Sequence, residues 1–182
     1  KDYKRTLAQR NRLLKQDNVQ ADHLFVWDVR LSDLGGKVVE KRQLYTDFLQ
    51  KQLTENYRSV SGNEEELSVV YDSKLPVEYY ANAMLQALKE KFDTDRIRGY
   101  TSVGPHRDDL KISLNGNDAK SSASRGETRS IVLALKIAEL KLLEEKTGIP
   151  KAHIKLISRG KMLFPRQRDG RPLNEVLISD LP

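Results

Sequence analysis

The stretch "SASRGETRSIVLALKIAELKLLEE", residues 122–145, decides most of what the sequence predicts about the fold. From Ile131 to Leu143 the apolar residues leave no consistently polar face, and a helix of that kind is normally buried on all sides. Ser124 and Glu127 have the spacing of a capping box, in which each side chain bonds a free N–H group of the first turn. The stretch therefore predicts a buried helix with a capped N-terminus.

Gly126 is not explained by the helix, because glycine lowers helix stability within the first turn. Glycine is useful where another group must approach the backbone closely. A helix N-terminus also offers free N–H groups and partial positive charge, which suit a phosphate. Two interpretations stay open for Ser124 and Gly126: they only cap the helix, or they also receive a phosphate group.

Outside this stretch, composition bounds the kind of protein. The chain has 182 residues, of which 38% are hydrophobic and 32% charged, and this suits long exposed helices more than a thick globule. Without cysteine it can form neither disulfides nor thiolate metal sites. No apolar run is long enough to span a bilayer. Because the chain starts without methionine and already in a helical pattern, we expect a fragment of something longer, without a signal peptide.

The formal net charge of +6 suggests nucleic acid as a partner, but most of the chain does not carry it. Residues 151–171 hold seven Lys or Arg and a single acid, Asp169, so the rest of the chain is neutral overall. One hypothesis is that this basic segment binds DNA phosphates. The candidate DNA-binding residues are Lys155, Arg159, Lys161, Arg166 and Arg168.

The N-terminal third has the pattern of two helices. Apolar residues recur at coiled-coil spacing within residues 2–15 and again from Leu24 to Phe48, with a turn between the two runs. This predicts an antiparallel helical hairpin, either a protruding arm or part of a bundle. Gly35 and Gly36 interrupt the second run and argue against an unbroken helix.

The middle of the chain mixes strands with a helix. After a loop at residues 61–66, alternation of Leu67, Val69 and Tyr71 predicts a half-buried strand. A second alternating run at residues 110–114 precedes an Asn115-Gly116 turn. Between the two strands, Pro76 is expected to start a helix. Its apolar stripe would be Val77, Tyr80, Met84, Leu88 and Phe92.

The segment "GPHRDD", residues 104–109, gathers charged side chains behind a Gly-Pro bend. His106 with Asp108 or Asp109 lacks further metal ligands nearby, so we expect no metal site. A general base at His106 is equally unsupported. The favoured interpretation is a strand entry at which Arg107 and the aspartates pair with neighbours.

Two nucleotide-binding motifs are missing from the sequence. No Walker A sequence G-x-x-x-x-G-K-[ST] occurs, and no run of four apolar residues ends in the paired acids of a Walker B motif. If Ser124 and Gly126 touch a nucleotide, the rest of that site must come from elsewhere. We therefore assign no catalytic residue, and we expect no ATP hydrolysis by this chain alone.

Several of these segments together resemble the RecF family, bacterial recombination-repair ATPases related to the SMC and Rad50 heads. The match runs through roughly residues 1–148, and its motifs agree in order. They are "LAQRNRLLK" (7–15), "VWDVRLSDLG" (26–35), "LSVVY" (67–71), "YTSVGPHRDDL" (100–110) and "SRGETRSIVLALKIAELKLLEEKTG" (124–148).

The resemblance implies an α/β fold, here an α+β fragment: part of an ABC/SMC-type P-loop ATPase head with an antiparallel helical arm. It implies a cytoplasmic protein that binds ATP, Mg²⁺ and DNA, dimerises with ATP, and acts with RecO and RecR to help load RecA on gapped DNA. Ser124, Arg125 and Gly126 match the ABC signature, which reaches the γ-phosphate held by the other subunit. Glu127 stands where the family usually has Gln. His106, Arg107 and Asp108 would support the same head.

Beyond Gly148 the chain departs from the family pattern, and "LNEVLISDLP" at its end resembles the family again. We hypothesise a local frame slip or a splice of foreign sequence between about Ile149 and Pro172, which translation of the other two reading frames would test. The alternative is a divergent basic loop.

Four parts are expected along the chain: a helical arm at 1–65, a return strand and helix at 66–98, a head segment with the signature at 99–148, and a basic tail of undetermined structure at 149–182. The function expected is that of a RecF-like repair segment that holds no cofactor by itself. The alternative is a non-catalytic coiled-coil interaction or DNA-binding module.

Overall fold

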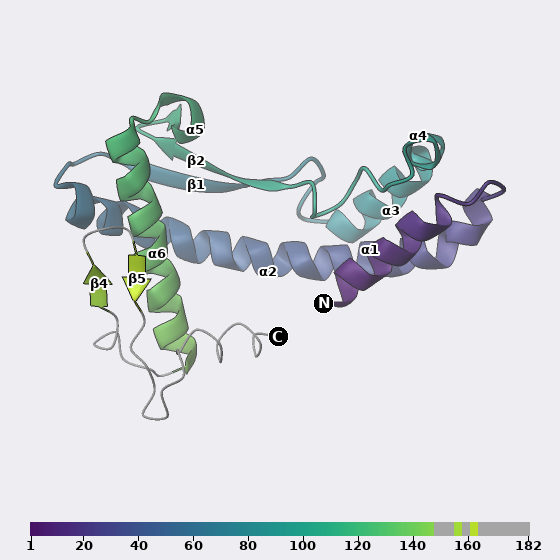
Figure 1. Cartoon of the computed structure of the whole chain (residues 1–182), viewed down its shortest axis with the longest axis horizontal. Helices are drawn as coiled ribbons and strands as arrows, with labels where there is room; N and C mark the ends of the chain where they lie inside the picture. Colours follow the sequence, from purple (N-terminus) through teal and green to yellow (C-terminus); the bar gives the residue numbers. More distant parts are fainter. Residues whose placement is uncertain (148–154, 158–160, 164–182) are drawn as a thin grey trace.

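One helix of 41 residues, α2 (Ala21–Ser61), forms the spine of the molecule. The structure is a computed structural model that describes residues 1–147, 155–157 and 161–163. Helix α1 (Asp2–Leu13) lies along one half of α2, and α6 (Arg125–Thr147) crosses its other end (Figure 1). The predicted pair of helices joined by a short turn is confirmed.

The expected break at Gly35 and Gly36 is wrong, because α2 runs through both residues. A Cβ added to Gly35 would lie 2.6 Å from Met84 Sδ, and one added to Gly36 would lie 3.1 Å from the Cβ of Ala81. Both partners belong to α3 (Tyr80–Glu90), which packs here against α2. The glycines allow close approach of two helices, and this packing offsets their poor helix propensity.

A small antiparallel sheet lies above the second half of α2. Strand β1 (Leu67–Asp72) pairs with β2 (Asp109–Leu114), and β2 turns into β3 (Asn117–Asp118). The Asn115-Gly116 turn is confirmed: both residues have positive φ, 50° and 81°, as the tight hairpin turn requires. The alternation in β1 is also confirmed, since its first, third and fifth residues are buried.

The outer edge of β1 is paired by side chains of α2. Thr54 Oγ1 donates to the carbonyl of Leu67 at 2.8 Å, and the amide of Val69 donates to Gln50 Oε1 at 2.7 Å. These bonds satisfy backbone groups that a sheet edge would otherwise leave open. They also fix the sheet, and the hairpin that leads to α6, relative to the spine.

The helix expected from Pro76 begins only at Tyr80. The chain reaches Pro76 through a turn in which the Ser73 hydroxyl bonds both the amide and the carbonyl of Leu75, and residues 76–79 form a further bend and turn before the helix. Tyr80, Met84 and Leu88 are buried as expected. Phe92 belongs instead to the separate helix α4 (Phe92–Arg98) and packs at the far end of the arm.

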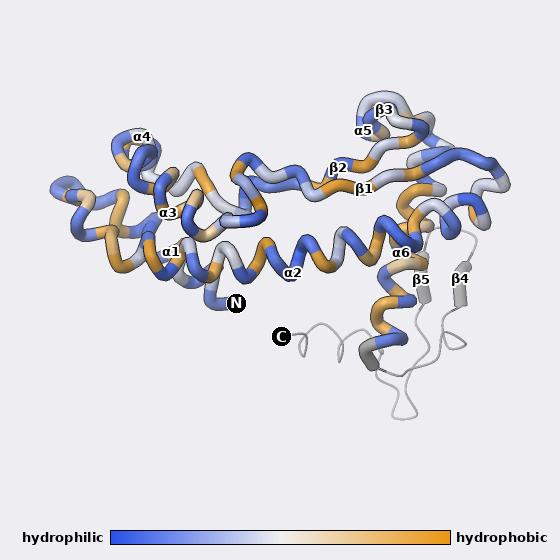
Figure 2. Tube along the Cα trace, turned by 180° about the vertical axis from the view of Figure 1, so that it is seen from behind, coloured by the Kyte–Doolittle hydropathy of each residue, from blue (hydrophilic) through white to orange (hydrophobic). Residues whose placement is uncertain are grey.

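The apolar core follows α2 in consecutive clusters rather than forming one centre. Figure 2 shows α2 in alternating hydrophilic and hydrophobic bands, as expected for an amphipathic helix with one packed face. The cluster near α6 contains Leu49, Leu53, Tyr57, Leu67, Val69, Leu114, Ile131, Ala134 and Ala138. The cluster around α1 and α3 contains Tyr3, Leu31, Val39, Tyr71, Tyr80, Met84 and Leu88.

The expectation that α6 is buried on all sides is wrong for the residues whose burial is described. Ile131, Ala134 and Ala138 are buried, whereas Val132 is 52% exposed. Only one face of α6 meets α2 and the sheet, so the rest of its apolar surface faces outward. Among the described helices, none is long and apolar enough to cross a membrane.

Of the basic tail, the structure describes only β4 (Lys155–Ile157) and β5 (Lys161–Leu163), which pair antiparallel. Lys155 and Lys161 begin these strands. The other predicted DNA-binding residues, Arg159, Arg166 and Arg168, lie outside the described residues, as does most of the segment assigned to a frame slip.

Candidate functional site

The N-terminus of α6 is capped as the sequence predicts. The Ser124 amide donates to Glu127 Oε2 at 2.6 Å, and the Glu127 amide donates to Ser124 Oγ at 3.3 Å. The Ser124 carbonyl accepts from both the amide and the hydroxyl of Thr128, each at 2.9 Å. The capping box is confirmed, and it holds the first turn in a defined geometry.

This cap lies on the surface and is not covered by the core. Ser124, Arg125 and Gly126 are all exposed. The amides of Arg125 and Gly126 donate to no group in the part of the chain that the structure describes. These are two of the free donors at the positive end of a helix, where an anion is stabilised.

Packing within the described chain does not require a glycine at position 126. A Cβ added there would meet only Ser124 Oγ, at 3.9 Å, which is an ordinary contact. This contrasts with Gly35, where the added atom would collide with a buried side chain. The bare backbone at Gly126 therefore leaves open space beside two free amides.

Glu127 sets the charge of the cap. Its bonds from the Ser124 amide and hydroxyl lower the pKa of its carboxyl, so the group is ionised at neutral pH. These bonds turn the carboxylate back toward Ser124. The exposed Arg125, which directly follows Ser124, adds a positive charge to the cap. The cap can receive an anion on the two amides that Glu127 does not use.

The second predicted group, His106, Arg107 and Asp108, lies far from this cap. Strand β2 begins just after Asp108, and the capped helix follows the hairpin at the strand's other end (Figure 1). The loop before β2 lies instead against α1, α2 and α3. The structure therefore does not bring the two predicted groups together within this chain.

Asp108 joins two elements through tyrosine hydroxyls. Its Oδ2 accepts from the hydroxyls of Tyr71 in β1 and Tyr80 in α3, each at 2.8 Å. Burial, with the nearby Asp108 carboxylate adding to it, raises the pKa of Tyr71 to about 12, and it raises the pKa of Tyr80 further. Arg42 of α2 donates to the Tyr71 hydroxyl and to the Pro105 carbonyl. The interpretation that the charged residues here pair with neighbours holds for Asp108, whose partners are neutral hydroxyls, whereas Arg107 and Asp109 form no ion pair within the described residues.

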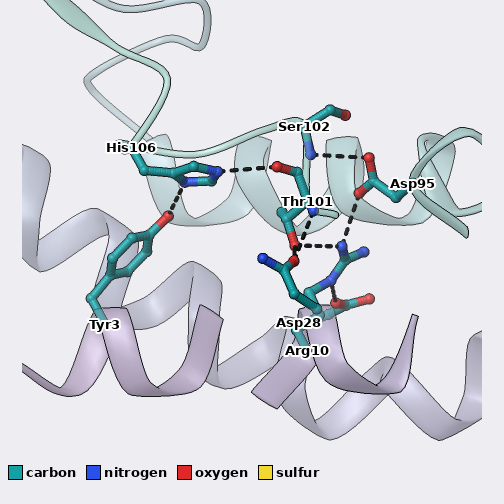
Figure 3. Close-up of polar contacts among 8 residues, drawn as sticks. Tyr3, Arg10, Asp28, Asp95, Thr101, Ser102 and His106 are labelled. Atoms are coloured by element: carbon teal, nitrogen blue, oxygen red, sulfur yellow. Dashed lines mark hydrogen bonds and ion pairs between the residues drawn. The ribbon is translucent and has the colours of Figure 1, made fainter. Parts of the chain in front are cut away.

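His106 uses both ring nitrogens inside the protein. Nδ1 lies 2.8 Å from the Tyr3 hydroxyl, and Nε2 lies 3.1 Å from the Thr101 carbonyl (Figure 3). Burial lowers the pKa of His106, which favours the neutral ring. Among the described residues, no three His, Asp or Glu side chains are grouped to hold a metal ion. The hydrogen bond between His106 and Tyr3 holds the loop on α1.

The sequence analysis missed a buried charge network centred on Arg10. Its guanidinium donates to Asp28 at 2.6 Å and to Asp95 and Thr101 at 2.8 Å each, and Arg10 itself is fully buried (Figure 3). The sequence did contain a signal for this network, because Arg10 occupies a position on the apolar seam of the first helix and Asp28 a position on that of the second. A charge on each seam of a helical hairpin predicts a buried pair.

No protein-family model matches the chain. Curated relatives do: a DNA replication and repair protein RecF from Citrifermentans bemidjiense is 41% identical over 144 residues, which is 76% of this chain. Another, from Clostridium perfringens, is 33% identical and covers 80% of it. The chain spans about two-fifths of the length of these relatives, 39% and 41%.

Solved structures agree with the sequence relatives. A structure of the recombination mediator protein RecF with ATP, from the RecFOR pathway, matches with a TM-score of 0.72 and 31% identity, over 80% of this chain and 41% of that one. A second, described as RecF-ATPrS, matches with a TM-score of 0.70 and 32% identity. The fold is therefore that of an ABC-type ATPase segment, and about four-fifths of this chain belongs to the RecF family of DNA replication and repair proteins.

Proposed function

We propose that this chain is a segment of a RecF-type DNA replication and repair protein whose Ser124–Glu127 cap contacts ATP held by another subunit. The observation that carries the proposal is the exposed cap with two unused amides beside a glycine that packing does not require. A nucleotide γ-phosphate is an anion of the right chemistry for such a helix terminus. The ATP named for the structural relative supports the same ligand.

Each residue of the cap has a distinct part in this proposal. The amides of Arg125 and Gly126 donate to phosphate oxygens, and Gly126 lets the phosphate approach the backbone. The Arg125 guanidinium adds positive charge, while the bond from Glu127 fixes Ser124. Because phosphoryl transfer depends on positioning and charge, a preformed cap contributes without any covalent step.

The remaining parts of the nucleotide site come from outside this chain, since the sequence holds no Walker A motif. We place the P-loop, its Mg²⁺ and the Walker B carboxylate on the residues of the full-length protein that this chain does not span. The complete protein then dimerises with ATP, binds DNA, and acts with RecO- and RecR-type partners toward RecA loading. In this proposal the arm is residues 1–65, and the signature belongs to 99–148.

The proposal is tested by ATP-dependent association of this chain with an intact RecF-family subunit that carries a P-loop. Sedimentation is measured with and without ATP for wild type, Gly126→Ala and Ser124→Asp. Aspartate keeps the helix cap but places a negative charge at the proposed phosphate position. Both variants should lose most of the ATP-dependent association without any loss in the free energy of unfolding.

Ser121→Ala is the matched control, because Ser121 is an exposed serine three residues before the cap whose hydroxyl bonds only the Asp118 carbonyl. It should associate like wild type. If Gly126→Ala and Ser124→Asp also associate like wild type, the cap is purely structural, and the interaction-module alternative is the better account.

A further inference from the structure

Two segments of this chain are basic and contain no acid. Residues 3–15 hold five Lys or Arg, residues 96–107 hold three Arg, and neither segment contains Asp or Glu. They are far apart in the sequence, so composition by itself does not join them. The distribution matters because the rest of residues 1–147 holds 17 Lys or Arg against 23 Asp or Glu, so the two segments carry the excess positive charge of this part of the chain.

The structure places these two segments side by side. The amide and hydroxyl of Thr101 donate to Asn11 Oδ1 at 2.8 and 2.7 Å, and the Tyr3 hydroxyl bonds His106 (Figure 3). At the far end of the contact, the side chain of Lys15 lies 3.4 Å from where a Cβ on Gly99 would be. The loop from Gly99 to His106 therefore follows α1 along its length.

Most of the positive charge on these segments faces outward. Arg10 is the exception, since Asp28 and Asp95 neutralise it inside. Lys4, Lys15, Arg98 and Arg107 are exposed and form no ion pair within the part of the chain that the structure describes. Lys4 lies two turns before Asn11 on the same face of α1, next to the loop.

An exposed aromatic ring lies within this group of cations. Tyr100 is 40% exposed, and the Arg107 guanidinium lies over its ring, 5.1 Å from the centroid. Positive side chains around an accessible aromatic ring are the combination that proteins use for nucleic acids, in which cations track the backbone and a ring stacks on bases. We name this set the basic arm surface; its residues are Lys4, Lys15, Arg98, Tyr100 and Arg107.

We propose that the basic arm surface binds the phosphodiester backbone of DNA. The inference rests on the proposed function in one respect, since a DNA repair role supplies the polyanion. It is separate from the nucleotide cap, which lies at the other end of α2 (Figure 1), and it uses no residue of the basic tail. Tyr100 stacks on an unpaired base where the DNA is single-stranded.

The test measures DNA binding by the whole chain without nucleotide. Fluorescence anisotropy is recorded with a labelled oligo-dT and with a duplex of the same length, over a series of salt concentrations. The triple variant Lys15→Glu, Arg98→Glu and Arg107→Glu is compared with the control Lys41→Glu, Lys51→Glu and Lys120→Glu. Both change the net charge equally, and the control residues are exposed and belong to α2 and α5 (Ala119–Ser122), outside the two acid-free segments.

The arm variant should bind at least tenfold more weakly than the control variant at moderate salt. Its slope of log K against log salt on duplex should fall by roughly two to three, at about 0.9 per phosphate contact. Urea unfolding checks that the variant folds. If it does not fold, Lys15→Gln, Arg98→Gln and Arg107→Gln replace it, with half or more of the slope change expected.

The variant Tyr100→Leu distinguishes binding of single-stranded DNA from binding of duplex DNA. It should weaken oligo-dT binding about fivefold or more, because base stacking is lost, and leave duplex binding nearly unchanged. Equal weakening by arm and control variants, or no DNA binding by the wild-type chain, would overturn the inference. Neither result bears on the proposed role of the nucleotide cap, because the ATP-dependent association of this chain is measured without DNA.

Discussion

The two ends of α2 are stabilised in different ways. At the arm end, a fully buried arginine ties α1, α2, α4 and the following loop together through hydrogen bonds to charged and hydroxyl groups. At the other end, apolar side chains of α2, the sheet and one face of α6 form the core, and the polar bonds between α2 and α6 link Gln52 and Asn56 to Lys141 and the Ala134 carbonyl, with no fully buried charge among them. Hydrogen bonds to fixed partners specify geometry, whereas apolar burial stabilises many similar packings.

The difference matches what each end presents at its surface. The arm end holds a loop in a fixed position beside α1, and that position assembles the basic arm surface. The other end needs only to anchor one face of α6, which leaves the helix cap exposed. Substitutions that remove the stabilising contacts at each end of α2 therefore test the comparison.

The largest effect is expected for Arg10→Ala. It leaves Asp28 and Asp95 buried without a counter-charge, so the free energy of unfolding should fall by about 3–5 kcal/mol in urea titrations at neutral pH. Burial already raises the pKa of Asp28, so the loss should shrink as acid neutralises the Asp28 carboxylate. Leu53→Ala, at the apolar end, should cost about 2–5 kcal/mol with no such dependence on pH.

Arg12→Ala is the control for this experiment, since Arg12 is exposed on the same helix and should change stability by less than about 0.5 kcal/mol. If Arg10→Ala costs no more than Arg12→Ala, the buried network contributes nothing to the stability of the arm end, and the contrast between the two ends is wrong.

A smaller effect on stability is expected from replacing a glycine by alanine, once in α2 beside α3 and once in the cap of α6. Gly35→Ala places a Cβ 2.6 Å from Met84 Sδ and should destabilise the protein by about 1–3 kcal/mol. Gly126→Ala meets no close atom and should stabilise it, by up to about 1 kcal/mol, through helix propensity. Thermal unfolding of both variants measures this, and destabilisation by Gly126→Ala would show an unrecognised packing role.

The smallest effect is expected at His106, which holds the loop on α1. Burial lowers its folded-state pKa, so the unfolded chain takes up the proton first as pH falls. The stability that His106 contributes is complete above its unfolded pKa of about 6.5 and is lost as pH falls through that value. His106→Gln should flatten the dependence of urea midpoints between neutral and mildly acidic pH. An unchanged profile would contradict this role.

Local patterns predicted most individual elements correctly. The alternation in β1, the Asn115-Gly116 turn and the capping box of α6 depend on residues near one another in the chain, so short-range rules are sufficient. The errors occurred where distant contacts decide. The break expected at Gly35 was wrong because Met84 and Ala81 pack into the space that the glycines leave.

The same division applies to the candidate site. The residues of the cap could be chosen from the sequence, because serine, glycine and glutamate in this spacing have a known effect on a helix start. Their accessibility could not, since an apolar helix is equally compatible with burial on all sides. The Arg10 network was missed because its third charge, Asp95, lies 85 residues away in the sequence.

The sequence by itself determined the pair of helices at the N-terminus, the strand β1, the capped start of α6 and the resemblance to RecF, since each depends on local spacing or on the order of motifs. Only the tertiary structure decided that the cap is exposed, that Asp108 joins β1 and α3, and that two acid-free segments share one surface. Burial and charge neighbourhood depend on contacts between residues far apart in the chain, and no local pattern encodes them.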